Sequence, residues 1–470
     1  MVLNRGRAAL TFWLILAYVA AQVMLAAWAG RGAKSDADYL VAGRKLGTFA
    51  VAMSVFATWF ASESLIATSG DVARDGLAGA RAEPFAYAIG IFAIGFYFAR
   101  RLRAGGHITI ADFLRARFGT GTEGLAAVVI ALSATTWSAA QLFGFATILA
   151  SASPLDFSTA LVAATLLVMT YTLFGGLAGD VWTDIVQGAI MILGICILLG
   201  LMVAAFGGVP AMLAAAPRSV SFTVAGESWS EGLELWLIPI IGTMVSQEAL
   251  ARTLGARSPE VARTGALAGG MIYLVVGLIP VSFGLFAPAL APMLGISFGE
   301  GEAFLPSLAE ALFPPWLYII FTGALISAIL SSVDSALLAV SGVVTESGYR
   351  RLAPGASPKA MLRAARLATI MAAAVAAIVA AQGESLRNLV LDASAIAAVL
   401  ALPMIAGLAG ISQSGRAAMT AIMVQIAVLM VCDWWLALDG AFLGMLASGT
   451  AAFALVTLAE RRTRPAPKTL

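Results

Sequence analysis

The sequence predicts an all-α integral membrane protein with about thirteen transmembrane helices. Of its 470 residues, 60% are hydrophobic and 11% are charged, whereas soluble domains contain about half apolar and about a quarter charged residues. Apolar runs of about 20 residues, the length that crosses the hydrocarbon core of a bilayer, recur along the whole chain. Basic residues gather between alternate runs, as in multi-pass membrane proteins. These observations indicate helices whose outer faces meet lipid.

The expected helices follow one another from residue 8 to residue 460. Their ranges are 8–29, 47–70, 84–103, 122–152, 155–174, 178–206, 232–252, 264–290, 315–343, 361–382, 385–411, 415–437 and 439–460. The first run is too long for the core of a signal peptide, and no small-residue cleavage site clearly follows it, so we expect a retained helix. No soluble stretch is long enough for a separate domain. Residues 1–470 are therefore expected to form a single transmembrane domain.

The distribution of Lys and Arg predicts the orientation in the membrane. With thirteen spans and an outside N-terminus, 22 of the 28 basic residues fall in cytoplasmic segments. The outer segments keep Arg5, Arg7, Arg74, Arg81, Arg218 and Arg387. We therefore expect a cell membrane protein with its N-terminus outside and its C-terminus in the cytoplasm.

The composition argues against enzymatic and metal chemistry. The only two cysteines, Cys196 and Cys432, lie inside apolar runs, and we expect buried hydrophobic side chains without a disulfide. The single histidine, His107, lies in a basic loop, so a transition-metal site is not expected. No nucleophile–base pair with histidine and no phosphate-binding loop is present. A net charge of +2 gives no reason to expect a nucleic-acid partner.

The second helix carries polar and small residues near its middle, over 57–64. Polar residues at this depth are unfavourable in lipid and usually face a cavity or a partner. Unwound backbone is tolerated at membrane depth only around a water-filled or ion-filled site. Glu63 favours such a site, and packing of small residues between helices is the alternative.

The seventh helix carries a second polar interruption, over 242–248. Matching interruptions in two halves of a chain are typical of inverted-repeat transporters with a substrate site near the midplane. A plain helix end is the alternative, because Arg252 and a basic loop follow closely. Glu248 would then form an ion pair at the membrane interface.

The ninth helix places oxygen-bearing residues on one face. Ala328, Ser331 and Ser332 are spaced i, i+3 and i+4, and Asp334 and Ser335 follow. One carbonyl and two hydroxyl oxygens suit a hard monovalent cation such as Na⁺. Periodicity alone does not separate this arrangement from packing by small residues.

Five segments, taken together and in order, resemble the sodium:solute symporter family, which includes sodium-coupled glucose, proline, pantothenate and choline carriers. These segments are 38–47 (DYLVAGRKLG), 109–119 (TIADFLRARFG), 171–177 (YTLFGGL), 182–187 (WTDIVQ) and 327–338 (SAILSSVDSALL). The resemblance implies a LeuT-like core of five helices repeated in inverted orientation. The extra helix would be 8–29, the repeats 47–206 and 232–411, and the terminal helices 415–460. It also implies alternating access, in which sodium binds before the solute.

The resemblance also implies a sodium site. The family's common site corresponds here to the backbone carbonyls of Ala57, Phe60 and Ala328 and to the hydroxyls of Ser331 and Ser332. Asp184 matches an aspartate on the family's inner sodium exit route. A cap at a helix start near the membrane edge is the other interpretation of Asp184.

The solute site implied by the resemblance is less complete. Its candidate residues are Trp59, Ser62, Glu63, Tyr87, Trp137, Gln141, Ser246 and Gln247. The segments 58–59 and 84–87 resemble the choline carriers, whose aromatic side chains enclose a quaternary ammonium. The chain departs from them in having Ser246 where they place a tryptophan, and from the proline carriers in having Trp59 in place of an aspartate. The solute class, whether amine, amino acid, carboxylate or sugar, stays open.

The predicted function is sodium-coupled symport of a small organic solute into the cell. A proton-coupled carrier, with Glu63 or Asp334 as the proton site, is an alternative, as is a facilitative carrier. A membrane sensor that works with a separate partner is a further alternative. The expected partners are the solute and the lipid bilayer, and the sequence does not indicate an oligomeric state.

Overall fold

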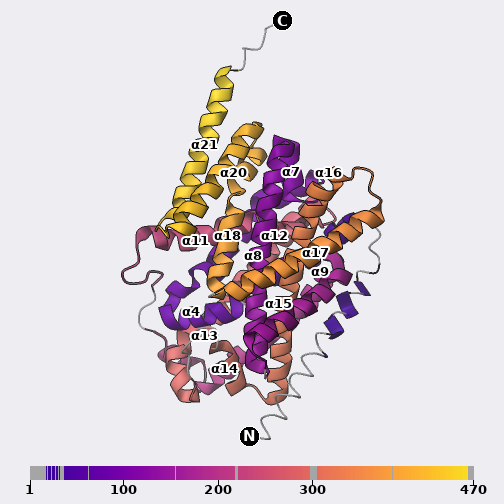
Figure 1. Ribbon diagram of the computed structural model, residues 1–470. Coiled ribbons are helices and arrows are strands. Elements are labelled where there is room, and N and C mark those ends of the chain that lie inside the picture. Colours follow the sequence, from indigo (N-terminus) through magenta and orange to yellow (C-terminus); the bar gives the residue numbers. More distant parts are fainter. Residues whose placement is uncertain are drawn as a thin grey trace.

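The chain folds into a bundle of helices (Figure 1). The computed structural model describes residues 36–463 except 62, 154, 218–220, 297–303 and 384, together with residues 17, 20–22, 24–26, 28–29 and 31. Within that part of the chain, β-type pairing is limited to one bridge between Leu46 and Ala256. The predicted helix 8–29 lies largely outside the described residues.

Many of the described helices suit a membrane. Ten of them are long and apolar enough to cross it by length and composition, and two shorter apolar helices, Thr48–Trp59 and Phe157–Thr170, accompany them. Large apolar side chains such as Phe96, Leu132 and Met371 are exposed, as expected where helices face lipid. The prediction of an all-α integral membrane protein is confirmed.

The first half of the described chain runs from α2 to α9. Its elements are α2 (Asp36–Val41), η1 (Ala42–Arg44), α3 (Thr48–Trp59), η2 (Glu63–Ala67), α4 (Thr68–Asp75), η3 (Gly76–Ala80), η4 (Arg81–Ala86), α5 (Tyr87–Ala93), η5 (Ile94–Phe98), α6 (Ala99–Ala104), α7 (Ile110–Phe118), α8 (Thr120–Ala152) and α9 (Phe157–Ala205). Gly176 interrupts α9 with a φ of +59°, a conformation that glycine adopts without steric cost. The sequence predicted two helices there, 155–174 and 178–206.

The second half of the chain repeats this mixture of long and broken helices. Its elements are α10 (Val209–Ala214), α11 (Trp229–Met244), α12 (Gln247–Leu254), α13 (Pro259–Leu294), α14 (Phe304–Leu312), α15 (Pro315–Val343), η7 (Val344–Tyr349), α16 (Arg350–Leu352), α17 (Pro358–Gln382), α18 (Leu386–Ala398), α19 (Ala401–Ala409), α20 (Gly415–Val428), η8 (Leu429–Trp435) and α21 (Ala441–Thr463). Figure 1 shows α20 and α21 side by side at one edge, and the two helices contact each other.

A helix break occurs at each of the two predicted polar interruptions. In the first half, α3 ends at Trp59, Phe60 has φ −91° and ψ 68°, and helical structure resumes at Glu63. In the second half, α11 ends at Met244 and α12 begins at Gln247. Because α12 continues for 8 residues, the seventh span is interrupted and does not simply end. Each break leaves backbone groups without helical partners.

Close packing fixes the broken helix α3 against α13. Gly265 and Gly269 lie one turn apart on α13, and an added Cβ would stand 2.6 Å from the Val51 Cβ and 2.8 Å from the Ala52 carbonyl oxygen, respectively. Small residues at such spacing allow membrane helices to approach closely. The division of the chain into repeats at 47–206 and 232–411 stays a prediction.

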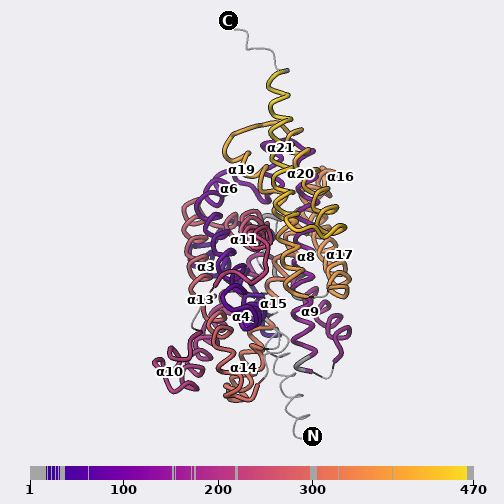
Figure 2. Tube along the Cα trace, turned by 90° about the vertical axis from the view of Figure 1, so that its left-hand side faces the viewer, coloured from indigo at the N-terminus to yellow at the C-terminus, as the bar shows by residue number. Residues whose placement is uncertain are grey.

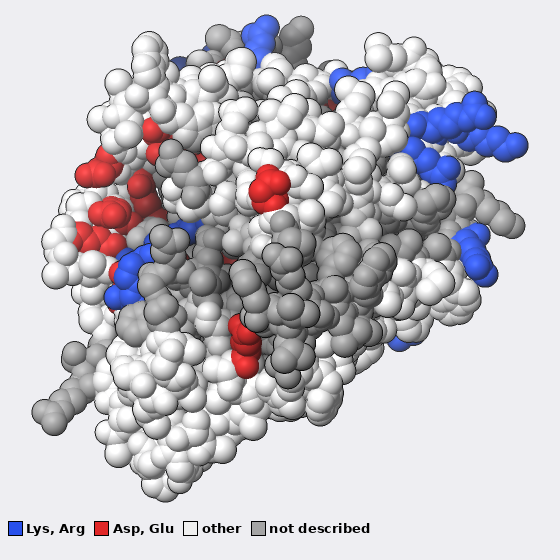
Figure 3. Space-filling model, turned by 60° about the horizontal axis from the view of Figure 1, so that its bottom comes forward, with Lys and Arg blue, Asp and Glu red and all other residues white. Residues whose placement is uncertain are grey.

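Helices α7 and α16, which lie in predicted cytoplasmic segments, are found at the end of the molecule from which α21 extends (Figures 1 and 2). Helices α6 and α19 lie at the same end. In Figure 3, where the opposite end comes forward, most of the described surface is uncharged and acidic side chains gather on one side of the view. This arrangement agrees with the basic-residue pattern, and the orientation itself stays a prediction.

One sequence expectation is wrong. Cys196 is exposed on α9 and Cys432 is partly exposed, although both were expected to be buried. Membrane helices present apolar side chains to lipid as well as to the core, so an apolar run does not identify the buried face. Both cysteines are free, as expected.

Candidate functional site

The α15 serines face the break that follows α3. The Ser332 hydroxyl donates to the Thr58 carbonyl oxygen at 3.2 Å, and both residues are buried. Thr58 lies between Ala57 and Phe60, two of the predicted carbonyl ligands, and the third, Ala328, lies one turn before Ser332 on α15. The structure therefore brings the carbonyl-rich end of α3 to the predicted hydroxyl ligands.

The neighbouring hydroxyl of Ser331 connects α15 to α9. It hydrogen-bonds to a carboxylate oxygen of Asp184 and lies 3.1 Å from Asp180 Oδ1. The Ser54 hydroxyl donates to the other Asp184 oxygen at 2.5 Å. Asp184 lies inside α9, is fully buried and contacts two other helices, so it does not cap a helix start at the membrane edge. A hydroxyl that donates its proton to a carboxylate keeps lone pairs for a cation.

Arg252 joins four helices next to Ser331 and Asp184. Its guanidinium hydrogen-bonds to Asp180 and Ser335, lies 3.6 Å from Asp184 and donates to the Ser54 hydroxyl at 3.3 Å. These partners lie on α9, α15 and α3, and Arg252 itself lies on α12. Its contact with Glu248 is to the backbone carbonyl, at 3.0 Å. Glu248 is buried and has no ion pair within the described residues, which disfavours the alternative of an ion pair at the membrane interface.

We expect Arg252→Gln to destabilise the protein strongly. Removing one partner of a buried ion pair leaves uncompensated charge and typically costs about 3–5 kcal/mol. Thermal unfolding of the purified protein should show a much lower midpoint for Arg252→Gln than for the wild type. The midpoint of Arg252→Lys should lie between those of the wild type and Arg252→Gln. The matched control is Arg100→Gln, because Arg100 and Glu260 form an exposed pair at 3.3 Å and such pairs contribute about 0–1 kcal/mol. Equal effects of the two Gln substitutions would contradict the assignment.

Three aromatic side chains from three helices form a second cluster, which we call the aromatic layer. Trp59 of α3 lies 5.1 Å from Tyr87 of α5 and 4.8 Å from Trp137 of α8, measured between ring centroids. All three are buried, and the Tyr87 hydroxyl lies 3.2 Å from the Ser394 hydroxyl of α18. The structure thus brings together the three aromatic residues predicted for the solute site.

Several buried polar atoms near the two helix breaks are unsatisfied. Within the described residues, the indole nitrogens of Trp59 and Trp137 and the hydroxyls of Thr243 and Ser246 are buried without a hydrogen-bond partner. Buried polar groups in folded proteins are normally satisfied. Such atoms, beside an aromatic surface, are suited to hold a polar solute.

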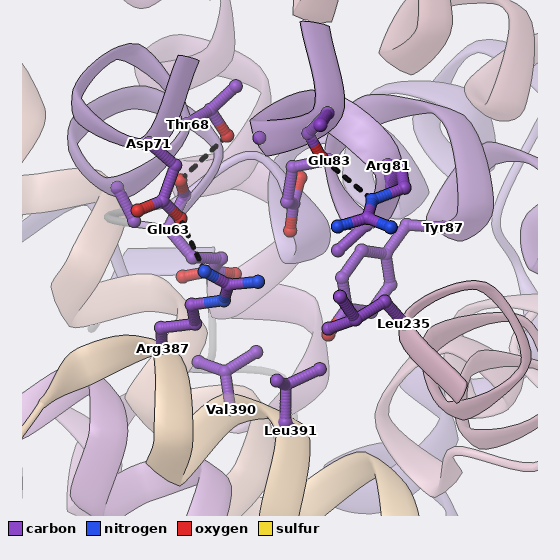
Figure 4. Close-up of a pocket in the computed structure, with 14 residues that line it drawn as sticks. Glu63, Thr68, Asp71, Arg81, Glu83, Tyr87, Leu235, Arg387, Val390 and Leu391 are labelled. Atoms are coloured by element: carbon purple, nitrogen blue, oxygen red, sulfur yellow. Dashed lines mark hydrogen bonds and ion pairs between the residues drawn. The ribbon is translucent and has the colours of Figure 1, made fainter. Parts of the chain in front are cut away.

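Glu63, Glu83 and Gln141 are each four residues along the chain from a member of the aromatic layer, and we call them the polar layer. The Gln141 amide donates to Glu63 Oε2 at 2.8 Å. Glu63, Glu83 and Tyr87 line a pocket together with Asp71, Arg81 and Arg387 (Figure 4). Arg387 lies 3.8 Å from Asp71, and Arg81 lies 2.6 Å from Glu227.

Two of the described candidate solute residues, Ser246 and Gln247, are not part of these layers. Gln247 begins α12, and its Oε1 accepts from the Ile110 amide at the start of α7, at 2.8 Å. Ser62 lies outside the described residues. Glu83 was not among the candidates, since nothing in its local sequence distinguishes it from an acidic residue at a helix end.

Comparison with known proteins gives consistent relationships. The family model described as "Sodium:solute symporter family" matches residues 39–409. The high-affinity choline transporter 1 of Caenorhabditis elegans is 26% identical over 82% of this chain and 70% of its own length. The corresponding transporter of Drosophila melanogaster is 25% identical, over 80% of this chain and 63% of its own length. The sodium/proline symporter of Escherichia coli is 27% identical over 78% of this chain and 76% of its own length.

Two solved structures share the fold. A sodium-coupled sialic acid symporter in a substrate-bound outward-open state has a TM-score of 0.77 at 18% identity, over 98% of this chain and 99% of that one. A nucleobase-cation-symport-1 family transporter in a closed conformation has a TM-score of 0.58 at 17% identity, over 91% of this chain and 95% of that one. The LeuT-like fold prediction is confirmed.

Proposed function

The chain belongs to the sodium:solute symporter family and is a sodium-coupled solute carrier of the membrane rather than an enzyme, and we propose that its coupling ion binds between the break after α3 and the serines of α15. The proposed ligands are the carbonyl oxygens of Ala57, Phe60 and Ala328 and the hydroxyl oxygens of Ser331 and Ser332. The observation that carries this proposal is the contact between Ser332 and the Thr58 carbonyl oxygen at 3.2 Å.

The chemistry of this ligand set suits Na⁺. Hard cations prefer oxygen ligands, and carbonyl oxygens are strong dipolar ligands that replace the hydration shell. The fully buried Asp184 carboxylate lies behind the Ser331 hydroxyl, so its charge favours a cation there. Asp184 also provides the proposed first contact on the way to the cytoplasm.

We propose that the solute binds at the aromatic layer and the polar layer, between the two broken helices. The candidate residues are Trp59, Ser62, Glu63, Tyr87, Trp137, Gln141, Ser246 and Gln247. The unsatisfied polar atoms of Trp59, Trp137 and Ser246 support this position. Gln247 instead hydrogen-bonds to the Ile110 amide, so we propose that it stabilises the start of α7.

Alternating access then requires the helices around Arg252 to separate. The ion pairs of Arg252 with Asp180 and Asp184 tie α12 to α9. We propose that they close the route from the sodium site to the cytoplasm and open when both substrates leave. An outside N-terminus and a cytoplasmic C-terminus belong to the same proposal.

Sodium coupling supplies enough free energy for accumulation. A tenfold gradient supplies ~1.4 kcal/mol per ion, and a membrane potential of ~100 mV adds ~2.3 kcal/mol per charge. The sum of ~3.7 kcal/mol sustains roughly a few-hundred-fold solute gradient at one ion per solute.

Uptake into proteoliposomes tests the proposed function. The solute that most stabilises the purified protein is supplied outside, under an inward Na⁺ gradient at equal pH or an inward proton gradient without Na⁺. Accumulation with the Na⁺ gradient alone is expected. Accumulation driven by the proton gradient without Na⁺ would replace sodium with proton coupling, and equilibration without accumulation would indicate a facilitative carrier.

A further inference from the structure

Each member of the polar layer is four residues along the chain from a member of the aromatic layer. The three pairs that are four positions apart are Trp59 with Glu63, Glu83 with Tyr87, and Trp137 with Gln141. In the continuous helix α8 this spacing places Trp137 and Gln141 on one face, about one turn apart, whereas Glu83 has non-helical dihedral angles (φ −117°, ψ 121°). Although the chain breaks between Trp59 and Glu63, the Ser64 hydroxyl closes the gap, lying 2.7 Å from the Trp59 carbonyl oxygen and 2.7 Å from Glu83 Oε2.

Glu83 presents one unsatisfied oxygen within this arrangement. The residue is 7% exposed, and its Oε2 hydrogen-bonds to the hydroxyls of Ser64 and Tyr273. Its Oε1 is buried without a hydrogen-bond partner among the described residues. Glu83 lines the same pocket as Glu63 and Tyr87, and Figure 4 shows it between Glu63 and Arg81. The geometry therefore leaves one carboxylate oxygen available to a ligand.

The basic residues of the pocket are engaged elsewhere. Arg81 donates to Glu227 at 2.6 Å and to the Ala78 carbonyl oxygen at 2.9 Å. Arg387 pairs with Asp71 at 3.8 Å. Within the described residues, Glu83 has no ion pair, and its contacts are to neutral hydroxyls. The pocket thus combines Glu63 and Glu83 with two arginines whose charges are already matched by Asp71 and Glu227.

A buried carboxylate is stable only when it is paired and hydrogen-bonded. An ammonium group with an N–H satisfies both requirements, because it brings positive charge and a donor for Oε1, and charge-assisted hydrogen bonds are the strong ones. A quaternary ammonium brings charge without a donor. A neutral polyol brings donors without charge.

We propose that Glu83 anchors the solute and that the solute is an organic ammonium with at least one N–H, with its carbon skeleton on the aromatic layer. This inference rests on the proposed function and deepens it by naming a solute class. Contact of the carbon skeleton with Trp59, Tyr87 and Trp137 accepts methylated and unmethylated ammonium compounds alike, so Glu83 supplies the selection for N–H.

Matched solutes test the selection. Thermal unfolding of the full chain in detergent is measured in saturating Na⁺ with ethanolamine, choline, 1,3-diaminopropane, glycerol, glucose and lactate. At least one primary amine should raise the midpoint, and ethanolamine should bind at least ten-fold more tightly than choline. Choline binding as tightly as ethanolamine, stabilisation confined to neutral or anionic solutes, or no response to either primary amine would overturn the inference.

Conservative variants test the role of Glu83. Glu83→Gln should weaken amine binding at least ten-fold and leave the midpoint shift caused by Na⁺ alone unchanged, and Glu83→Asp should retain part of the affinity. Glu346→Gln is the control, because Glu346 pairs with Arg350 at 2.9 Å outside the pocket. Unchanged amine affinity in Glu83→Gln would overturn the inference. Na⁺-dependent stabilisation by another solute class would leave the symport function standing, whereas loss of every Na⁺ effect in the wild-type chain would remove that function as well.

Discussion

Replacing Ser332 with alanine should weaken sodium binding by about ten-fold to about a hundred-fold. The hydroxyl is a proposed ligand, and hydrogen bonds or contacts to charged groups contribute about 1.5–3 kcal/mol, where about 1.4 kcal/mol corresponds to ten-fold. The residue is fully buried on α15 against the Thr58 carbonyl oxygen. Binding of radioactive Na⁺ to the purified protein measures the change directly.

The matched control for this substitution lies on the same helix. The Ser341 hydroxyl is equally buried and donates to the Ala365 carbonyl oxygen at 3.0 Å, so Ser341→Ala removes a similar hydrogen bond away from the proposed site. It should leave sodium affinity within about two-fold, on the same scale of about 1.4 kcal/mol per ten-fold. Sodium affinity that is unchanged in Ser332→Ala, or reduced equally in both variants, would remove the proposed ion site.

Replacing Trp59 with alanine should abolish solute binding while sodium binding persists. The substitution removes the central ring of the aromatic layer, which contacts both Tyr87 and Trp137. Buried tryptophans at binding sites contribute at least about 2 kcal/mol, more than about ten-fold in affinity. Trp59 supplies none of the five proposed sodium ligands. The stabilising solute should therefore no longer raise the unfolding midpoint, and added Na⁺ should still raise it.

A second tryptophan separates this effect from general destabilisation. Truncating a buried tryptophan costs about 3–5 kcal/mol of stability, so only midpoint differences with and without solute are compared. Trp236 of α11 contacts Phe222 and Phe85, at 5.8 Å and 6.5 Å between ring centroids, and Trp236→Ala should retain the solute response. Normal solute affinity in Trp59→Ala would place the solute elsewhere.

The sequence predicted the fold and the helix breaks because both have local signals. Apolar runs identify spans by length alone, and the polar residues around Glu63 and Ser246 interrupt two of those runs. Both interruptions coincide with the observed breaks after Trp59 and Met244. The i, i+3, i+4 spacing on α15 likewise places Ser331 and Ser332 together without any tertiary information.

The parts that the sequence did not predict depend on contacts between distant segments. Asp180 is separated by 72 residues from Arg252, its ion-pair partner. Gln247 was assigned to the solute because the resemblance implied it, yet its side chain accepts a hydrogen bond from the Ile110 amide on α7. The carboxylate of Glu83 depends on Tyr273, 190 residues away. Neither periodicity nor a local motif specifies which buried faces meet.

The most direct test of sodium coupling is the thermal stability of the purified chain in Na⁺ compared with K⁺. Each salt is tested with and without each member of a library of amines, amino acids, carboxylates and sugars. A ligand that binds the folded state raises the unfolding midpoint. We expect Na⁺ to raise it where K⁺ does not, and at least one solute to raise it further only when Na⁺ is present. Equal midpoints in the two salts, with the same solute response in both, would contradict the proposed sodium site and its coupling to the solute.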